Sequence, residues 1–234
     1  MADIVLVHGG WHGGWVWRDV LPRLEAAGHR VIAPTMTGLG ERRHLASEDV
    51  TPDVHVADIV NAIRWADMTD VVLVGHSYAG YIITAVAGQM PERIASLVYL
   101  DAFVPETSGE CVFSAWPPER IEAIKASLKG GFLVPPSGIE NWSADPETRA
   151  WLTRMATPHP IRCFTEGPAL TGREREVKRR LYLWCAELDP SPFRPFYDKF
   201  RKDPDWRVAK LDCLHDAMLE VPDELTWEII SMVP

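Results

Sequence analysis

The sequence predicts an α/β protein with a mostly parallel central sheet and helices on both of its faces. Short apolar runs rich in β-branched residues alternate with segments of helical apolar spacing, and this alternation indicates βαβ units. The 234 residues are 47% hydrophobic and 24% charged, which is ordinary for a globular chain that can bury a sizeable core.

The first half of the chain contains four of the expected strands and three expected helices. The strands are expected at residues 4–7, 29–34, 71–74 and 96–101. The helices are expected at 17–27, where Gly28 follows as a C-cap, at 53–65 and from 81 to about 90. The polar segment between residues 35 and 53 is expected to be a loop.

The regular alternation stops after residue 103 and resumes near residue 176. Strands are then expected at 180–185 and 206–211, and helices at 192–201 and 222–232. The segment 104–175 is rich in Pro, Gly and Trp, with short helical patterns at 118–128 and 146–155. So short a segment buries too little core to fold alone. We therefore expect a cap inserted after the strand that ends at Asp101, in a single domain whose core is formed by residues 1–103 and 176–234.

Charge and cysteine content exclude several classes of protein. A net charge of −9 argues against nucleic acid or an anionic membrane surface as a partner. The four cysteines form no C-x-x-C pair, so neither a metal site such as zinc nor a disulfide framework is indicated. No apolar run approaches the roughly 18 residues that a membrane helix needs, and the N-terminus has no basic leader. We expect a cytoplasmic protein that acts on a small molecule.

Ser77 lies in a sharp turn between a predicted strand and a predicted helix. The turn reads Gly75-His76-Ser77-Tyr78-Ala79-Gly80, a G-x-S-x-A pattern. Its small residues let the flanking backbones approach closely, and the turn would hold the serine in a strained conformation. This context is typical of a nucleophile elbow. The pattern alone also fits an ordinary strand-to-helix loop, so the prediction depends on partners for Ser77.

A serine hydroxyl needs a base to take its proton, and that base needs a carboxylate to orient it. Of the eight histidines, His215 directly follows the last expected strand and precedes the closing helix. The chain order nucleophile, acid, histidine places the base at this position. We predict His215 as the base of Ser77.

Two residues are alternatives for the acid. Asp101 ends the strand after the Ser77 turn, with apolar sequence on both sides, so its carboxylate needs a partner if it is buried. Asp189 follows the next strand in a Pro-rich stretch that also fits a plain turn. The usual arrangement favours Asp189, whereas the apolar surroundings favour Asp101. We predict Asp101 and keep Asp189 as the alternative acid.

The first expected strand leads into His8-Gly9-Gly10-Trp11-His12-Gly13-Gly14-Trp15. Two Gly pairs in this loop allow backbone N–H groups to face a ligand. An oxyanion hole needs one N–H from such a loop and one from the residue after the nucleophile. We predict the Gly10 and Tyr78 amides for this role. A phosphate-binding turn is the alternative, but neither G-x-G-x-x-G nor a P-loop lysine is present.

The first loop, the Ser77 turn and the segment His215-Asp216-Ala217-Met218 together resemble the α/β-hydrolase superfamily. The resemblance covers nearly the whole chain and is to the branch of plant methylesterases, hydroxynitrile lyases and their bacterial esterase relatives. It implies the α/β-hydrolase fold, a serine nucleophile without a cofactor, and Gly10 and Tyr78 as oxyanion donors. The pattern from Tyr99 to Pro105 is similar to the bacterial relatives and implies Asp101 as the acid. Dimers through the cap are common in this family, so a homodimer is one expected assembly.

The same resemblance separates esterase from lyase chemistry. The lyases use a threonine beside the oxyanion loop and a lysine after the catalytic histidine, and these positions match Gly9 and Asp216 here. An acid at position 216 would repel cyanide, so lyase activity is not expected.

We therefore predict a serine esterase that cleaves small carboxylic esters through an acyl-enzyme. Aromatic residues of the cap and of the first loop, including Trp11, Trp116 and Trp142, are expected to line an apolar substrate pocket. Alternatively, these aromatic residues only pack the cap onto the sheet. Other functions compatible with the triad are hydrolysis of amides, carbamates or lactones and cofactor-free C–C cleavage. A non-catalytic small-molecule-binding protein could also use this fold.

Overall fold

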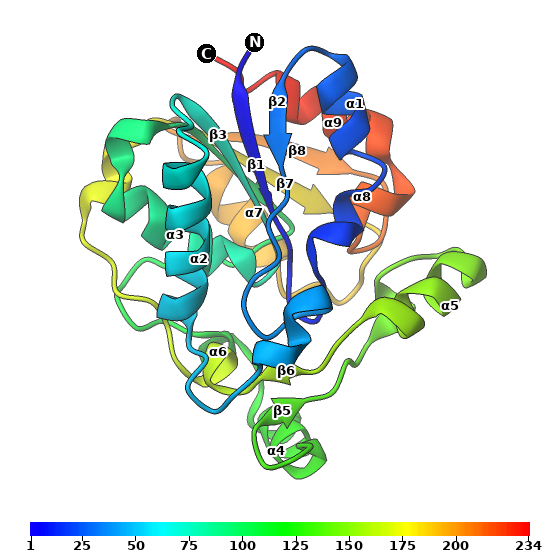
Figure 1. Cartoon of the computed structure of the whole chain (residues 1–234). Helices are drawn as coiled ribbons and strands as arrows, with labels where there is room; N and C mark the ends of the chain where they lie inside the picture. Colours follow the sequence, from blue (N-terminus) through cyan, green and yellow to red (C-terminus); the bar gives the residue numbers. More distant parts are fainter.

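The computed structural model describes residues 1–234 and contains a six-stranded parallel sheet with the order β2-β1-β3-β4-β7-β8 (Figure 1). The strands are β1 (Asp3–Val7), β2 (Arg30–Ile32), β3 (Val71–His76), β4 (Ile94–Leu100), β7 (Arg179–Cys185) and β8 (Arg207–Leu211). All six expected strands are present, and the predicted fold class is confirmed. The fourth strand ends at Leu100, one residue earlier than expected.

Helices cover both faces of the sheet. On one face lie α1 (Leu21–Ala26), α8 (Ala217–Glu220) and α9 (Pro222–Ile230), and on the other lie α2 (Pro52–Trp65), α3 (Ala79–Gln89) and α7 (Arg194–Phe200). Hydrophobic clusters of 39 and 21 buried residues fill the two layers. Successive β1 residues alternate between them, with Val5 and Val7 in the first cluster and Ile4 and Leu6 in the second. The sheet is therefore buried on both faces, as its continuous apolar strands require.

The first helix begins later than its apolar spacing predicts. Trp17, expected to start it, ends the 3-10 helix η1 (Gly14–Trp17), residues 18–20 form a turn, and α1 starts at Leu21 with Pro22 in its first turn. Proline has no N–H to donate and is tolerated in the first turn of a helix, so Pro22 sets the start. Two further 3-10 helices are η2 (Gly40–Leu45) and η3 (Pro91–Arg93). None of the helices combines the length and the apolar character that crossing a membrane requires.

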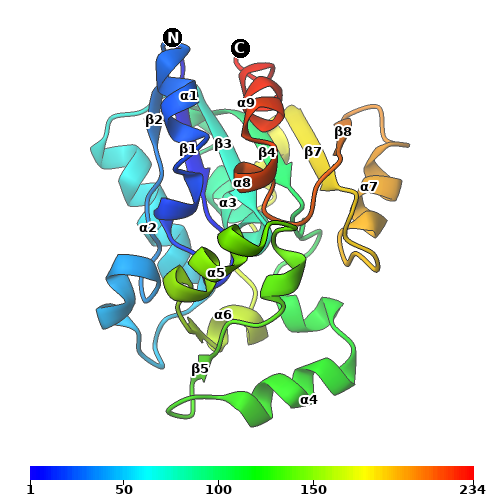
Figure 2. The same cartoon turned by 90° about the vertical axis from the view of Figure 1, so that its right-hand side faces the viewer.

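The segment between β4 and β7 extends from the carboxyl end of the sheet, opposite the two termini (Figures 1 and 2). It contains η4 (Val112–Ala115), α4 (Pro118–Ser127), β5 (Leu133–Val134), η5 (Ile139–Asn141), α5 (Pro146–Met155), β6 (His159–Pro160), α6 (Arg162–Thr165) and η6 (Arg173–Glu176). The short strands β5 and β6 pair antiparallel. Both expected helices are present, and the exact cap limits, 104–175, stay a prediction.

Candidate active site

Ser77 lies in the tight turn that joins β3 to α3. Its φ of 55° is in the left-handed region, which is strained for a residue with a side chain. The turn is fixed by hydrogen bonds from the Ser77 N–H to the Leu100 carbonyl (3.1 Å) and from the Phe103 N–H to the Ser77 carbonyl (3.2 Å). Gly80 is required here, because a Cβ at this position would lie 1.8 Å from the Phe103 carbonyl oxygen. The elbow is thus held by close backbone packing against the end of β4.

His215 and Asp101 meet at the carboxyl ends of their strands. The His215 Nδ1–H donates to Asp101 Oδ2 at 2.6 Å, and both residues are buried. Asp101 Oδ1 accepts from the Cys185 N–H at 3.2 Å, at the end of the neighbouring strand β7. Because Nδ1 carries this proton, the Nε2 lone pair is free to accept another. Phe193 stacks on the imidazole, with ring centroids 5.0 Å apart and an interplanar angle of 5°.

The two candidate acids have opposite environments. Burial raises the pKa of the Asp101 carboxyl, while the hydrogen bond from His215 opposes the rise. Asp189 is exposed in the loop after β7 and makes no side-chain hydrogen bond or ion pair. The structure therefore brings Asp101, and not Asp189, to His215.

Two buried amides near Ser77 have no partner within the chain. Neither the Gly10 N–H nor the Tyr78 N–H donates a hydrogen bond to a protein acceptor. Buried backbone N–H groups are rarely unpaired. A side chain at the preceding residue, Gly9, would also collide, because its Cβ would lie 2.8 Å from His76 Nδ1 and 3.0 Å from Ser77 Cβ. The first loop therefore lies directly against the elbow, with donors available for a ligand.

A cavity of about 120 Å³ joins Ser77 to His215. The three tryptophans predicted to contact substrate, Trp11, Trp116 and Trp142, all line it. Arg120 of α4 also lines it, with its guanidinium 4.0 Å from the Trp116 ring centre, and no acidic residue does. A larger cavity, about 250 Å³, lies beside Tyr99 and Trp206 and includes neither Ser77 nor His215. We place the candidate site in the smaller cavity because it contains the reactive groups.

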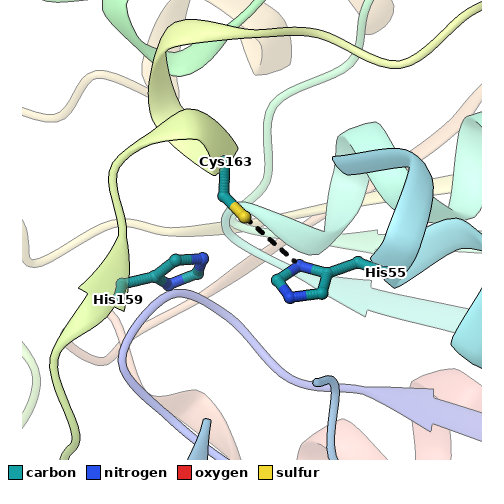
Figure 3. Close-up of side chains that lie close together, drawn as sticks. All are labelled: His55, His159 and Cys163. Carbon is teal, nitrogen blue, oxygen red and sulfur yellow. Dashed lines mark hydrogen bonds between the residues drawn. The ribbon is translucent and has the colours of Figure 1, made fainter. Parts of the chain in front are cut away.

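Three buried side chains beside the site have the residue types of a metal centre. Ligand atoms of His55, His159 and Cys163 lie within 4.8 Å of one another (Figure 3). The hydrogen bonds, however, occupy the imidazole lone pairs. His55 Nε2–H donates to the Thr37 carbonyl at 2.8 Å, so its Nδ1 accepts from the Tyr78 hydroxyl at 3.0 Å.

His159 uses only one of its ring nitrogens in a hydrogen bond, and its buried Nε2 has no partner. His159 Nδ1 accepts from the Trp11 N–H at 3.2 Å, which leaves its proton on Nε2. Burial raises the pKa of the Cys163 thiol to about 12, so this thiol carries its proton in the observed arrangement. With these hydrogen bonds in place, the three side chains do not fit a metal ion. The cluster instead anchors the Tyr78 ring beside the elbow.

The sequence predicts no role for His12, and it indicates Asp216 only as a replacement for the lyase lysine. The structure buries both and joins them at 3.1 Å, although they are 204 positions apart. The sequence shows that His12 lies close to Gly10 and that Asp216 directly follows His215. It does not show that His12 and Asp216 are in contact. Arg120 was also missed, because one arginine on a polar helix has no distinguishing pattern.

A parallel sheet that carries a serine in a strand-to-helix turn, with a histidine–aspartate pair at its carboxyl edge, is the arrangement of α/β hydrolases. The alpha/beta hydrolase family matches residues 4–226, and the chain belongs to that family. The carbendazim hydrolyzing esterase of Nocardioides sp. (strain SG-4G) is 40% identical over 99% of this chain and 100% of that protein. Methylesterase 9 of Arabidopsis thaliana is 34% identical over 80% of each chain.

Among solved structures, an extracellular alpha/beta-hydrolase from a Paenibacillus species superimposes with a TM-score of 0.84. It is 22% identical, covers 100% of this chain and 99% of that one, and supports the fold alone. The predicted family and α/β-hydrolase fold are confirmed, and the chain is an enzyme of the carboxylic ester hydrolase class.

Proposed function

We propose that the chain is a serine esterase that cleaves small carboxylic esters through an acyl-enzyme on Ser77. The observation that carries this proposal is the buried hydrogen bond of 2.6 Å between His215 Nδ1 and Asp101 Oδ2, behind a cavity that both His215 and Ser77 line. That bond presents the Nε2 lone pair of the imidazole as a base. No hydrogen bond joins Ser77 to His215, and catalytic hydrogen bonds of this kind often tighten only when substrate binds.

In the proposed mechanism, the Ser77 Oγ attacks the ester carbonyl and His215 Nε2 takes its proton. Asp101 stabilises the resulting imidazolium and keeps the ring in the productive tautomer. The Gly10 and Tyr78 N–H groups stabilise the tetrahedral oxyanion. His215 then gives the proton to the departing alcohol, which leaves an acyl-serine. Water, activated by the same histidine, releases the acid and restores Ser77.

The lining of the cavity favours esters with a small aromatic or alkyl group. Trp11 and Trp142 stack with ring centroids 5.9 Å apart and form one wall. Trp11 is also used structurally, because its indole N–H donates to the Val134 carbonyl of β5 at 3.1 Å. Trp11 therefore both lines the pocket and packs the cap onto the core. The two interpretations of the aromatic residues are compatible for this side chain.

Hydrolysis of an aromatic carbamate ester is the second candidate. It is favoured by the end-to-end similarity to an esterase named for hydrolysing carbendazim, an aromatic methyl carbamate. The same acyl-transfer chemistry would apply, with a carbamoyl group on Ser77. Comparing carbendazim with p-nitrophenyl butyrate at equal enzyme concentration tests which ester class is preferred.

The principal test is hydrolysis of p-nitrophenyl acetate and butyrate by the wild type and by Ser77→Ala. We expect the variant to lose at least about 10³-fold in kcat, since the nucleophile is removed. A fluorophosphonate probe should label the wild type at Ser77 and leave the variant unlabelled. Ser114→Ala, which alters an exposed serine of the cap, is the matched control. Full activity in Ser77→Ala would refute the proposal.

A further inference from the structure

His12 is the buried histidine whose two ring nitrogens both face hydrogen-bond acceptors. Its Nδ1 lies 2.6 Å from the Gly10 carbonyl oxygen and its Nε2 lies 3.1 Å from Asp216 Oδ2. A neutral imidazole has only one N–H, so it cannot donate to both. The two residues therefore share one additional proton, which corresponds to an imidazolium at His12 paired with a carboxylate at Asp216.

The burial of the pair supports this protonation. The side chains of His12 and Asp216 are 2% and 0% exposed, and a charge so deeply buried must be compensated. Burial by itself lowers the pKa of His12, but the charge of Asp216 and the hydrogen bonds outweigh it, so the net shift is upward. His8, in the same loop, shows the contrast, since burial lowers its pKa to about 3.

The pair connects the loop of the oxyanion donors to the loop of the catalytic base. On one side, His12 fixes the Gly10 carbonyl. On the other side, Asp216 directly follows His215, and its N–H donates to the Trp142 carbonyl at 2.9 Å. His76 completes the link, because its Nε2–H donates to the His215 carbonyl at 3.1 Å while lying 3.8 Å from Asp216 Oδ1.

We propose that His12 is a positioning residue of this enzyme: paired with Asp216, it fixes the Gly10 backbone and neutralises the second buried carboxylate beside His215. This inference rests on the proposed serine esterase function. The need to neutralise a carboxylate arises because two acidic side chains lie at the site. Asp101 and Asp216 are both fully buried, and Asp216 acts on the Asp101 carboxyl through its charge. Without His12, Asp216 would stabilise the imidazolium of His215, which cannot accept the Ser77 proton.

The other titratable groups near the pair do not supply this compensation. Those facing His215 are Asp101, Asp216, His76 and the Cys185 thiol, and those facing His12 are Asp216, His76, His8 and His159. Burial lowers the pKa values of His8, His76 and His159, so these three imidazoles are neutral. Burial also raises the pKa of Cys185 and keeps its thiol protonated.

The test is the pH dependence of kcat/KM for p-nitrophenyl butyrate in His12→Asn. The asparagine Nδ2 can replace Nδ1 as the donor to Gly10, but the positive charge is lost. We expect the acid limb, where His215 loses its proton, to move upward by on the order of one pH unit. His12→Gln, whose amide can reach Asp216 and not Gly10, should move it in the same direction and provides a second variant if the first does not fold.

The double variant His12→Asn/Asp216→Asn separates charge from structure. Removing both charges should return the acid limb to its wild-type position, although two contacts are then altered. His8→Asn is the matched control, because His8 Nδ1–H donates to the Gly9 carbonyl at 2.8 Å and holds the same loop without a charge. It should lower kcat by about tenfold, less than the 10²–10³ lost with a whole oxyanion donor, and leave the limb in place.

Two results would overturn the role of His12: an unmoved acid limb in both single variants, or a shift that persists in the double variant. Fluorophosphonate labelling of the wild type distinguishes this failure from failure of the proposed function. Labelling at Ser77 with an unmoved limb refutes only the His12 inference. Absence of labelling refutes the serine esterase itself.

Discussion

At the scale of single residues, Asp101 is held in place mainly by the backbone around it. Its φ of 41° turns the chain sharply at the end of β4, and its N–H donates to the Leu183 carbonyl of β7 at 2.7 Å. The carboxylate is then bound by the Cys185 N–H and by His215. Two neighbouring parallel strands therefore fix an acid that comes directly after the first of them.

This arrangement predicts the effect of changing each candidate acid. Asp101→Asn should lower kcat by about 10⁴-fold, because an amide N–H facing Nδ1 would favour the wrong imidazole tautomer. Asp189→Asn should leave kcat unchanged, since the side chain is exposed and unbonded. Steady-state hydrolysis of p-nitrophenyl butyrate measures both, with thermal unfolding to show that each variant is folded. A loss confined to Asp189→Asn would show that our choice of acid is wrong.

The sequence could place Ser77 and His215 in one candidate site because a turn pattern and chain order suffice for that inference. It left Asp101 and Asp189 as alternatives, because both follow predicted strands. What separates them in the structure is hydrogen bonding across β4 and β7, together with burial. Neither property is a local feature of the sequence.

At the scale of elements, α4 brings a cation to a cavity that has no acidic lining residue. Arg120 lies in the first turn of this helix, makes no ion pair, and stacks over Trp116. An unpaired guanidinium at a ligand cavity is suited to a carboxylate or a carbonyl acceptor of the substrate. We therefore expect α4 to favour esters that carry such a group away from the scissile bond.

This expectation is tested with two p-nitrophenyl esters, the neutral butyrate and the anionic monoester of glutaric acid. Arg120→Gln should raise KM for the anionic ester by about tenfold, the loss of one charge-assisted hydrogen bond, with kcat unchanged. KM for the butyrate should stay the same. Lys125→Gln is the control on the same helix, because Lys125 pairs with Glu122 at 2.9 Å and does not line the cavity. Equal changes for both esters would contradict the role of Arg120.

Elements were predictable where the periodic pattern was long. The six strands and the helices α2, α3, α4, α5, α7 and α9 were expected within a few residues. The two-residue strands β5 and β6 and the four-residue helices α6 and α8 were missed, because segments this short have no measurable period. In the case of α1, apolar spacing continued through the 3-10 turn and concealed the start that Pro22 imposes.

At the scale of the whole molecule, the buried histidines couple stability to pH. Burial lowers the pKa values of His8 to about 3 and of His55 to about 4, and shifts those of His76 and His159 well downward. An unfolded histidine titrates near 6.5. The stability these four contribute is therefore present above about pH 6.5 and is lost as the pH falls toward their folded values. His12 acts in the opposite direction, because its contribution is lost as the pH rises through its raised pKa.

Four buried histidines have lowered pKa values, whereas only His12 has a raised one. The free energy of unfolding should therefore fall steeply between pH 7.5 and pH 5. His8 and His55, whose folded pKa values are about 3 and about 4, each account for about 2 kcal/mol at pH 5. Urea unfolding followed by fluorescence of the ten tryptophans, at pH 7.5, 6 and 5, measures this dependence. His8→Asn should reduce the difference between pH 7.5 and pH 5 by about 2 kcal/mol, whereas His44→Gln, at an exposed position, should not change it. A stability that is flat over this range would contradict neutral burial of these imidazoles, because folding would then release no protons.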